Sequence, residues 1–91
     1  MTLNIVQIIE DEPLHAQLLD HSLRQARYRT NVAHDGVTGL ADVMRLTPSL
    51  ILLDLMLPDG LGIGFLKKLR ADGSATPVII LTALDQISDR I

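Results

Sequence analysis

Leu50-Ile51-Leu52-Leu53-Asp54 is the most informative stretch of the chain, because four large aliphatic residues run directly into a carboxylate. Two other runs have the same form: residues 3–9 lead into Glu10-Asp11, and residues 78–81 lead into Thr82. Short runs rich in leucine and β-branched residues are typical of strands buried on both faces, which are parallel strands. In an open parallel sheet, ligands bind just beyond the carboxyl ends of the strands. The sequence therefore predicts one site where these oxygen-bearing side chains meet.

The segments between these runs have the pattern of helices. Pro13 suits the first turn of a helix, and Leu14 and Leu18 belong to the apolar positions that recur after it. The order β-α-β-α-β-α-β, followed by a fragment of a helix, predicts an α/β fold with helices on both faces of a parallel sheet. The expected helices cover residues 13–26, 37–46 and 63–71, with a strand at 30–33, a turn-rich loop at 57–62 and a helix entered within 84–91.

Length, charge and composition narrow the possible functions. Ninety-one residues make at most one domain, and a net charge of −3 without a basic cluster argues against direct nucleic-acid binding by this segment. The chain has no cysteine, which excludes disulfides, thiolate chemistry and cysteine-based zinc sites. The first residues carry neither a basic stretch nor a long apolar segment, and no run is long enough to span a bilayer. We expect a cytoplasmic domain without a membrane partner.

The predicted site is acidic and suits a hard cation. Carboxylates about 5 Å apart repel each other by about 3 kcal/mol per pair at an effective dielectric near 20. A cluster of Glu10, Asp11 and Asp54 must therefore raise pKa values or bind a cation, and oxygen ligands favour Mg²⁺ or Mn²⁺. In the alternative, Glu10, Asp11 and Glu12 merely cap the first helix while Asp54 ends a strand. An unpaired charge after four aliphatic residues is expensive, which weakens that alternative.

Asp54 is the candidate nucleophile, since a carboxylate can accept a phosphoryl group as an aspartyl-phosphate. Thr82 could donate its hydroxyl to a phosphoryl oxygen, or it could be a strand-end threonine bonded to backbone. Ala83 is small and would leave the approach to Asp54 open. Other motifs give no functional assignment. Gly60, Gly62 and Gly64 lack the spacing of a dinucleotide fingerprint or a P-loop. We expect His15, His21 and His34 to be surface residues.

Four segments in order resemble a bacterial response-regulator receiver domain: residues 8–13 (IIEDEP), 33–36 (AHDG), 52–60 (LLDLMLPDG) and 77–83 (PVIILTA). The resemblance covers nearly the whole chain. It implies a flavodoxin-like, doubly wound, three-layer α/β/α fold with sheet order 2-1-3-4-5. The fifth strand and fifth helix of that fold have no counterpart in the sequence, so we expect a receiver domain over residues 1–91 that is truncated within or before its fourth helix.

The resemblance also implies a role for each site residue. Asp54 would be the phosphoacceptor, taking a phosphoryl group from a sensor histidine kinase or a phosphotransfer protein. Asp11, Asp54 and the backbone carbonyl of Met56 would ligate Mg²⁺, or Mn²⁺ in its place, with Glu10 helping directly or through water. Thr82 would be the switch residue. On this interpretation the protein is not an enzyme, apart from self-phosphorylation and autodephosphorylation on Asp54, and any output domain was lost or lies C-terminal.

The sequence departs from the family pattern in several places. Relatives carry a lysine at the end of the fifth strand, for which Lys67 and Lys68 on the outer face of a helix cannot substitute. Met56 and Leu84, which stand where receivers tune the hydrolytic water, are apolar, so we expect slow loss of the phosphoryl group. Arg27 replaces a frequent glycine after the first helix, which predicts a different cap. The strand at 78–81 would be an exposed hydrophobic edge, open to homodimer formation or element exchange.

Two rival functions are the alternatives to this interpretation. A pseudo-receiver would keep the fold as a phosphorylation-independent interaction or dimerisation scaffold. The complete set of Glu10, Asp11, Asp54 and Thr82 argues against it, while the absence of the fifth-strand lysine leaves it open. A hydrolase of the haloacid-dehalogenase type would need a second aspartate where Met56 stands.

Overall fold

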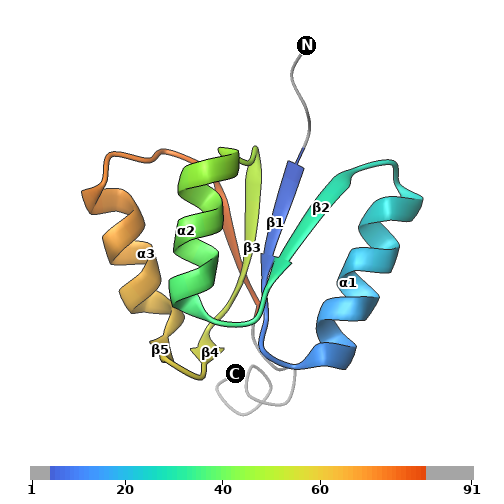
Figure 1. Cartoon of the computed structure of the whole chain (residues 1–91), viewed down its shortest axis with the longest axis horizontal. Helices are drawn as coiled ribbons and strands as arrows, with labels where there is room; N and C mark the ends of the chain where they lie inside the picture. Colours follow the sequence, from blue (N-terminus) through green and yellow to red (C-terminus); the bar gives the residue numbers. More distant parts are fainter. Residues whose placement is uncertain (1–4, 82–91) are drawn as a thin grey trace, which may run out of the picture.

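A four-stranded parallel sheet organises the computed structural model of the chain, which describes residues 5–81 (Figure 1). The strand order is β2-β1-β3-β6 with every pair parallel, which confirms the predicted flavodoxin-like α/β class and its 2-1-3-4 order. A separate pair, β4 and β5, is antiparallel. The elements are β1 (Ile5–Ile9), α1 (Pro13–Gln25), β2 (Arg29–Ala33), α2 (Gly36–Leu46), β3 (Leu50–Asp54), β4 (Met56–Leu57), β5 (Gly60–Leu61), α3 (Gly62–Ala71) and β6 (Val78–Leu81).

The sheet lies between two helical layers, and each face has its own core. Figure 1 shows α1 against one face and α2 with α3 against the other. Successive side chains of a strand point to opposite faces, so each central strand supplies both cores. The α2/α3 side buries Ile9, Val43, Ile51, Leu53, Phe65 and Leu69, and the α1 side buries Val6, Ile8 and Leu52.

The first helix begins and ends at residues with identifiable capping bonds. The Glu12 side chain accepts a hydrogen bond from the Leu14 N–H, and Pro13 follows as the first helical residue. At the other end, Tyr28 N–H donates to Leu23 C=O and Arg27 N–H donates to Arg24 C=O, which is a Schellman motif. The expectation of a different cap was wrong, because Arg27 adopts the left-handed conformation (φ 71°) itself.

The apolar face expected for α1 was partly wrong. Leu14 and Leu18 are each 59% exposed, whereas Ala16 is buried and Leu19 and Leu23 pack on the sheet. At 100° per residue, the residues 16, 19 and 23 form one stripe. Residues 14 and 18 lie about half a turn away from that stripe, so they face outward.

The turn-rich loop expected at 57–62 contains regular structure. Met56 pairs with Leu61 and Leu57 pairs with Gly60, so β4 and β5 form a small hairpin directly after β3. The loop of this hairpin is Pro58-Asp59, and Gly60 has a φ of 139° that favours glycine. The sequence signalled the turn but not the pairing.

The sheet ends at β6 within the part of the chain that the structure describes. Ile79 is 51% exposed and Ile80 is 43% exposed, which confirms the expected hydrophobic edge. The predicted fourth helix falls within residues 82–91, which lie outside the described residues, and so does the expected point of truncation. None of the helices within residues 5–81 has the length and apolar content needed to cross a bilayer.

Candidate functional site

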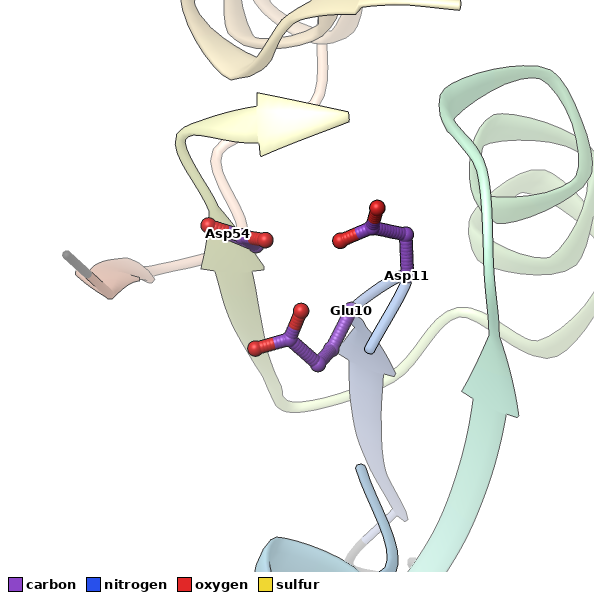
Figure 2. A group of neighbouring side chains, drawn as sticks. All are labelled: Glu10, Asp11 and Asp54. Carbon is purple, nitrogen blue, oxygen red and sulfur yellow. The ribbon is translucent and has the colours of Figure 1, made fainter. Parts of the chain in front are cut away.

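Three carboxylates meet at the carboxyl ends of the two central strands. Ile9 is the register partner of Leu53, so Glu10 and Asp54 follow at the same level of the sheet. Asp11 comes from the turn between β1 and α1. One oxygen from each of Glu10, Asp11 and Asp54 lies within 4.8 Å of the others, and Figure 2 shows the carboxylates around a common space. The predicted convergence of these residues is therefore observed.

Burial differs among the three carboxylates in a way that suits a binding site. Glu10 is 5% exposed, Asp54 is half-buried and Asp11 is exposed. A ligand can thus approach Asp54 and Asp11 from solvent, while Glu10 lies beneath them. Oxygen donors of this kind are typical of a Mg²⁺ site.

The electrostatics of the cluster are visible in Glu10. Its burial is the largest cause that raises the pKa of this carboxyl to about 7, followed by its hydrogen bond with Asp54 and the charge of Asp54. The backbone N–H of Glu12, 3.1 Å from Glu10 Oε2, acts in the opposite direction. One carboxyl of the cluster is thus held partly protonated near neutral pH, as the repulsion argument from the sequence requires.

Backbone contacts hold Asp54 and the residues that follow it. Met56 N–H donates to Asp54 Oδ1 at 3.2 Å, and Gly62 N–H donates to Leu55 C=O at 2.6 Å. A Cβ at position 62 would lie 2.7 Å from the Asp54 carbonyl oxygen, so the start of α3 can approach β3 only because residue 62 is glycine. The loop after Asp54 therefore folds back closely on the end of β3, and it leaves the Met56 side chain exposed.

Two histidines that the sequence assigned to the surface also contact the cluster. His34 Nδ1 lies 3.0 Å from the Glu10 carbonyl oxygen and donates its proton to it, since a carbonyl can only accept. His15 Nδ1 lies 3.6 Å from Glu10 Oε1. Both rings are exposed, as expected, but their contacts with Glu10 were not foreseen. His15 follows Glu10 by only five residues, in the first turn of α1, so the sequence gives a local indication of its contact. His34 reaches Glu10 only because β1 pairs with β2.

The remaining candidate residues are placed only in part. Thr82, Ala83 and Leu84 lie outside the described residues, so the roles expected for them stay predictions. Lys67 and Lys68 are exposed on α3, in agreement with the expectation that they lie on the outer face of this helix.

An open parallel α/β sheet with carboxylates gathered beyond its central strands defines a flavodoxin-like domain with a cation-binding type of site. Comparison with known proteins identifies the family to which this domain belongs. The chain belongs to the response regulator receiver domain family, whose model matches residues 6–91. It is thus a receiver domain of the two-component response-regulator kind, and the receiver domain is not a classical enzyme family.

Individual relatives agree with this assignment. The probable transcriptional regulatory protein TcrX of Mycobacterium tuberculosis is 38% identical over 86 residues, which are 94% of this chain and 37% of that protein. The receiver domain of the Francisella response regulator 1452 has 35% identity and a TM-score of 0.84, over 90% of this chain and 68% of that one. The BeF3-activated N-terminal receiver domain of Klebsiella pneumoniae RstA has 29% identity and a TM-score of 0.82, over 87% and 67%. The chain therefore spans little more than a third of the length of TcrX.

Proposed function

We propose that the chain is the phosphoacceptor receiver of a two-component system and that Asp54 accepts the phosphoryl group. The observation that carries the proposal is the meeting of Glu10, Asp11 and Asp54, with the Asp54 carboxylate half-buried at the end of β3. A lone strand-end aspartate would need no acidic neighbours, and three close carboxylates are costly unless a cation or a proton joins them.

The donor is a phosphohistidine of a sensor histidine kinase or of a phosphotransfer protein. An Asp54 carboxylate oxygen attacks phosphorus, an O–P bond forms, and the N–P bond of the phosphohistidine breaks. The imidazole nitrogen keeps the electron pair. The accepting oxygen must be ionised for this attack, and the half-exposed position of Asp54 leaves it open to the donor.

The same residues fit Mg²⁺, or Mn²⁺ in its place. Asp11, Asp54 and the Met56 backbone carbonyl would hold the ion, with Glu10 binding directly or through water. When bound, the ion supplies positive charge to the phosphoryl oxygens. Because the pKa of Glu10 is raised to about 7, binding would release part of a proton from this residue near neutral pH.

Phosphorylation would act as a conformational switch. Thr82 follows β6 in the sequence and is the switch residue of the proposal, and the small side chain of Ala83, the next residue, would leave access to the phosphoryl group. A group that favours one of two conformations shifts the population toward it. The relative TcrX is a probable transcriptional regulatory protein, and we extend the proposal to control of an output domain of that kind.

The lifetime of the phosphoryl group is a further part of the proposal. Met56 is exposed beside the site, and neither it nor Leu84 can orient a hydrolytic water by hydrogen bonding. The aspartyl-phosphate should therefore decay slowly. Replacing both residues, Met56→Asn with Leu84→Gln, should shorten the half-life measured by loss of phosphoprotein with time. An unchanged decay rate would contradict this role.

The proposed metal site has its own test. The chain and its Asp11→Asn variant are incubated with acetyl phosphate over a range of Mg²⁺ concentrations, and phosphoprotein is separated on a phosphate-affinity gel. We predict Mg²⁺-dependent phosphorylation of the chain and much weaker metal dependence in the variant. Equal phosphorylation of both proteins in the presence of EDTA would overturn the proposed site.

A further inference from the structure

Asp59 makes an unusual contact with a helix to which it does not belong. Its Oδ1 accepts a hydrogen bond from Gly36 N–H at 2.8 Å, and its Oδ2 accepts one from Val37 N–H at 2.8 Å. These two bonds are the main causes that lower the pKa of Asp59, so this carboxylate is ionised at neutral pH. They satisfy two of the free N–H groups at the start of α2.

Helix α2 has its own N-cap besides this contact. Asp35 accepts a hydrogen bond from Thr38 N–H at 2.7 Å, as a residue at that position ordinarily does. Asp59 is therefore not needed to begin the helix. Its two bonds add a connection between α2 and the hairpin that follows Asp54.

The hairpin depends on contacts of this kind. β4 and β5 have two residues each, and a hairpin so short is not stable alone in water. Asp59 lies in the loop at its tip, and Met56, whose carbonyl is a proposed metal ligand, lies at its base. Holding the tip restricts the position of the base.

The start of α2 is in turn connected to the other half of the site. His34, two residues before Gly36, donates from Nδ1 to the Glu10 carbonyl at 3.0 Å. The segment 34–37 thus touches the end of β1 on one side and the hairpin after β3 on the other. It links the backbones that carry the Glu10-Asp11 pair and the Asp54 loop.

Gly36 leaves room for this contact. A Cβ at position 36 would lie 3.2 Å and 3.4 Å from the two Asp59 carboxylate oxygens. A larger residue at position 36 would therefore crowd the carboxylate and make it shift by a few tenths of an ångström.

We propose that Asp59 is a positioning residue for the metal site: by binding the first two N–H groups of α2, it holds the Met56 carbonyl where it can share one ion with Asp54 and Asp11. This inference rests on the proposed function, since it concerns the same Mg²⁺ site. Asp59 itself touches neither the ion nor the phosphoryl group. Its loss should weaken metal binding without removing the phosphoacceptor.

The test compares Mg²⁺ affinity, measured by calorimetric titration, in the chain and in its Asp59→Ala and Asp59→Asn variants. Asparagine has one acceptor oxygen and can keep one of the two bonds. Changes to residues that orient metal ligands typically cost about ten- to a hundredfold in affinity. We expect the dissociation constant to rise about tenfold in Asp59→Ala and by less in Asp59→Asn.

The matched control is Asp35→Ala, which removes the cap of the same helix and leaves the Asp59 contact in place. Its Mg²⁺ affinity should equal that of the unchanged chain. Phosphorylation by acetyl phosphate adds a second readout. In the Asp59 variants the Mg²⁺ concentration for half-maximal rate should rise, while the rate at saturating Mg²⁺ stays within about twofold, because the chemistry on Asp54 is intact.

Each outcome has one meaning. Equal Mg²⁺ affinity in the chain and in Asp59→Ala would overturn the positioning role. An equal loss of affinity in Asp35→Ala would also overturn it, because that loss would indicate only a weaker helix. If the unchanged chain, shown to be folded by circular dichroism, bound no Mg²⁺, the proposed function itself would fail whatever the variants did.

Discussion

Glu10 is the residue at which the cost of gathering three carboxylates is concentrated. It is 5% exposed and has Asp54 beside it, and both effects favour its protonated form. In the unfolded chain the same group returns to its ordinary pKa of 4.5. The folded protein therefore binds more protons than the unfolded one between about pH 4.5 and 7.

The sign of the pH dependence is fixed by this difference in proton binding. For a carboxyl whose pKa is raised on folding, the stability contribution is fully present below pH 4.5 and is lost as the pH rises through about 7. Without divalent ions, the free energy of unfolding should fall by up to about 3 kcal/mol over this range, at about 1.4 kcal/mol per pKa unit. Urea unfolding at pH 5 and pH 8 measures it, and Glu10→Gln should remove most of the difference.

Saturating Mg²⁺ gives the control for this prediction. The ion favours ionised carboxylates, so it should stabilise the protein more at pH 8 than at pH 5. Asp72→Asn, at an exposed position after α3, should leave the pH dependence as it is. A free energy of unfolding that rises between pH 5 and pH 8 in EDTA would contradict this role of Glu10.

Single residues also show how far the sequence predicts the site. The meeting of Glu10, Asp11 and Asp54 was predicted, because hydrophobic runs precede them and parallel strands end at the same edge. The contacts of Asp59 with α2 and of His34 with Glu10 were not predicted. Their partners lie 22 to 24 positions away in the chain, so no local pattern marks them.

Among the elements, the central strand β1 contains a buried polar residue that is hydrogen-bonded to its neighbours. The hydrophobic pattern of the strand does not predict this residue. Gln7 has 0% exposure in the middle of the strand and is the register partner of Asn31 on β2. Asn31 Nδ2 donates to Gln7 Oε1 at 2.9 Å and to Asp42 Oδ2 of α2 at 2.8 Å. One amide therefore joins two strands and a helix.

Removing that amide should be costly. Asn31→Ala leaves the buried Gln7 oxygen without a donor, which costs about 1–3 kcal/mol of unfolding free energy. The control is Arg45→Ala, which removes only the exposed partner of Asp42, 3.1 Å away, and should cost under about 1 kcal/mol. Urea unfolding of both variants would contradict this role for Asn31 if their losses were equal.

The elements themselves were largely predictable, and the errors have physical causes. Long aliphatic runs and helical spacing located the four parallel strands and three helices to within a few residues. The β4–β5 hairpin was read as a loop, because two-residue strands have no periodicity to detect. The cap at Arg27 was misjudged because hydrogen bonds to Leu23 and Arg24 hold a non-glycine residue in the left-handed conformation.

At the scale of the whole molecule, β6 is an edge strand of the sheet that residues 5–81 form. Among residues 5–81 this strand pairs only with β3, and it exposes apolar side chains on both faces of the sheet, Ile79 on one and Ile80 on the other. Such an edge can accept another strand, and two copies related by a two-fold axis can pair their edges antiparallel. We propose a second copy of this chain as the partner.

Self-association should therefore depend on β6. Sedimentation velocity of the chain should show dimers that increase with concentration, and Ile80→Lys should shift the population toward monomer, since a charged edge resists pairing. Met44→Lys, at an equally exposed apolar position on α2, is the matched control and should leave association unchanged. A monomer at all concentrations would contradict the proposal, and so would an equal effect of both lysines.

At this scale, the fold class and strand order could be predicted from the sequence because β-α alternation leaves few arrangements of a parallel sheet. The position of Thr82 relative to Asp54 could be inferred only from the family, and it stays a prediction. Phosphorylation of Asp54 is likewise inferred from the family and stays a prediction. Everything proposed about signalling depends on it.

The intact mass of the chain after incubation with acetyl phosphate and Mg²⁺ tests that chemistry most directly, with the Asp54→Ala variant alongside. We predict the mass of one added phosphoryl group on the chain, lost when EDTA replaces Mg²⁺, and no addition to the variant. An equal addition to Asp54→Ala, or none to a chain shown by circular dichroism to be folded, would contradict phosphotransfer to Asp54.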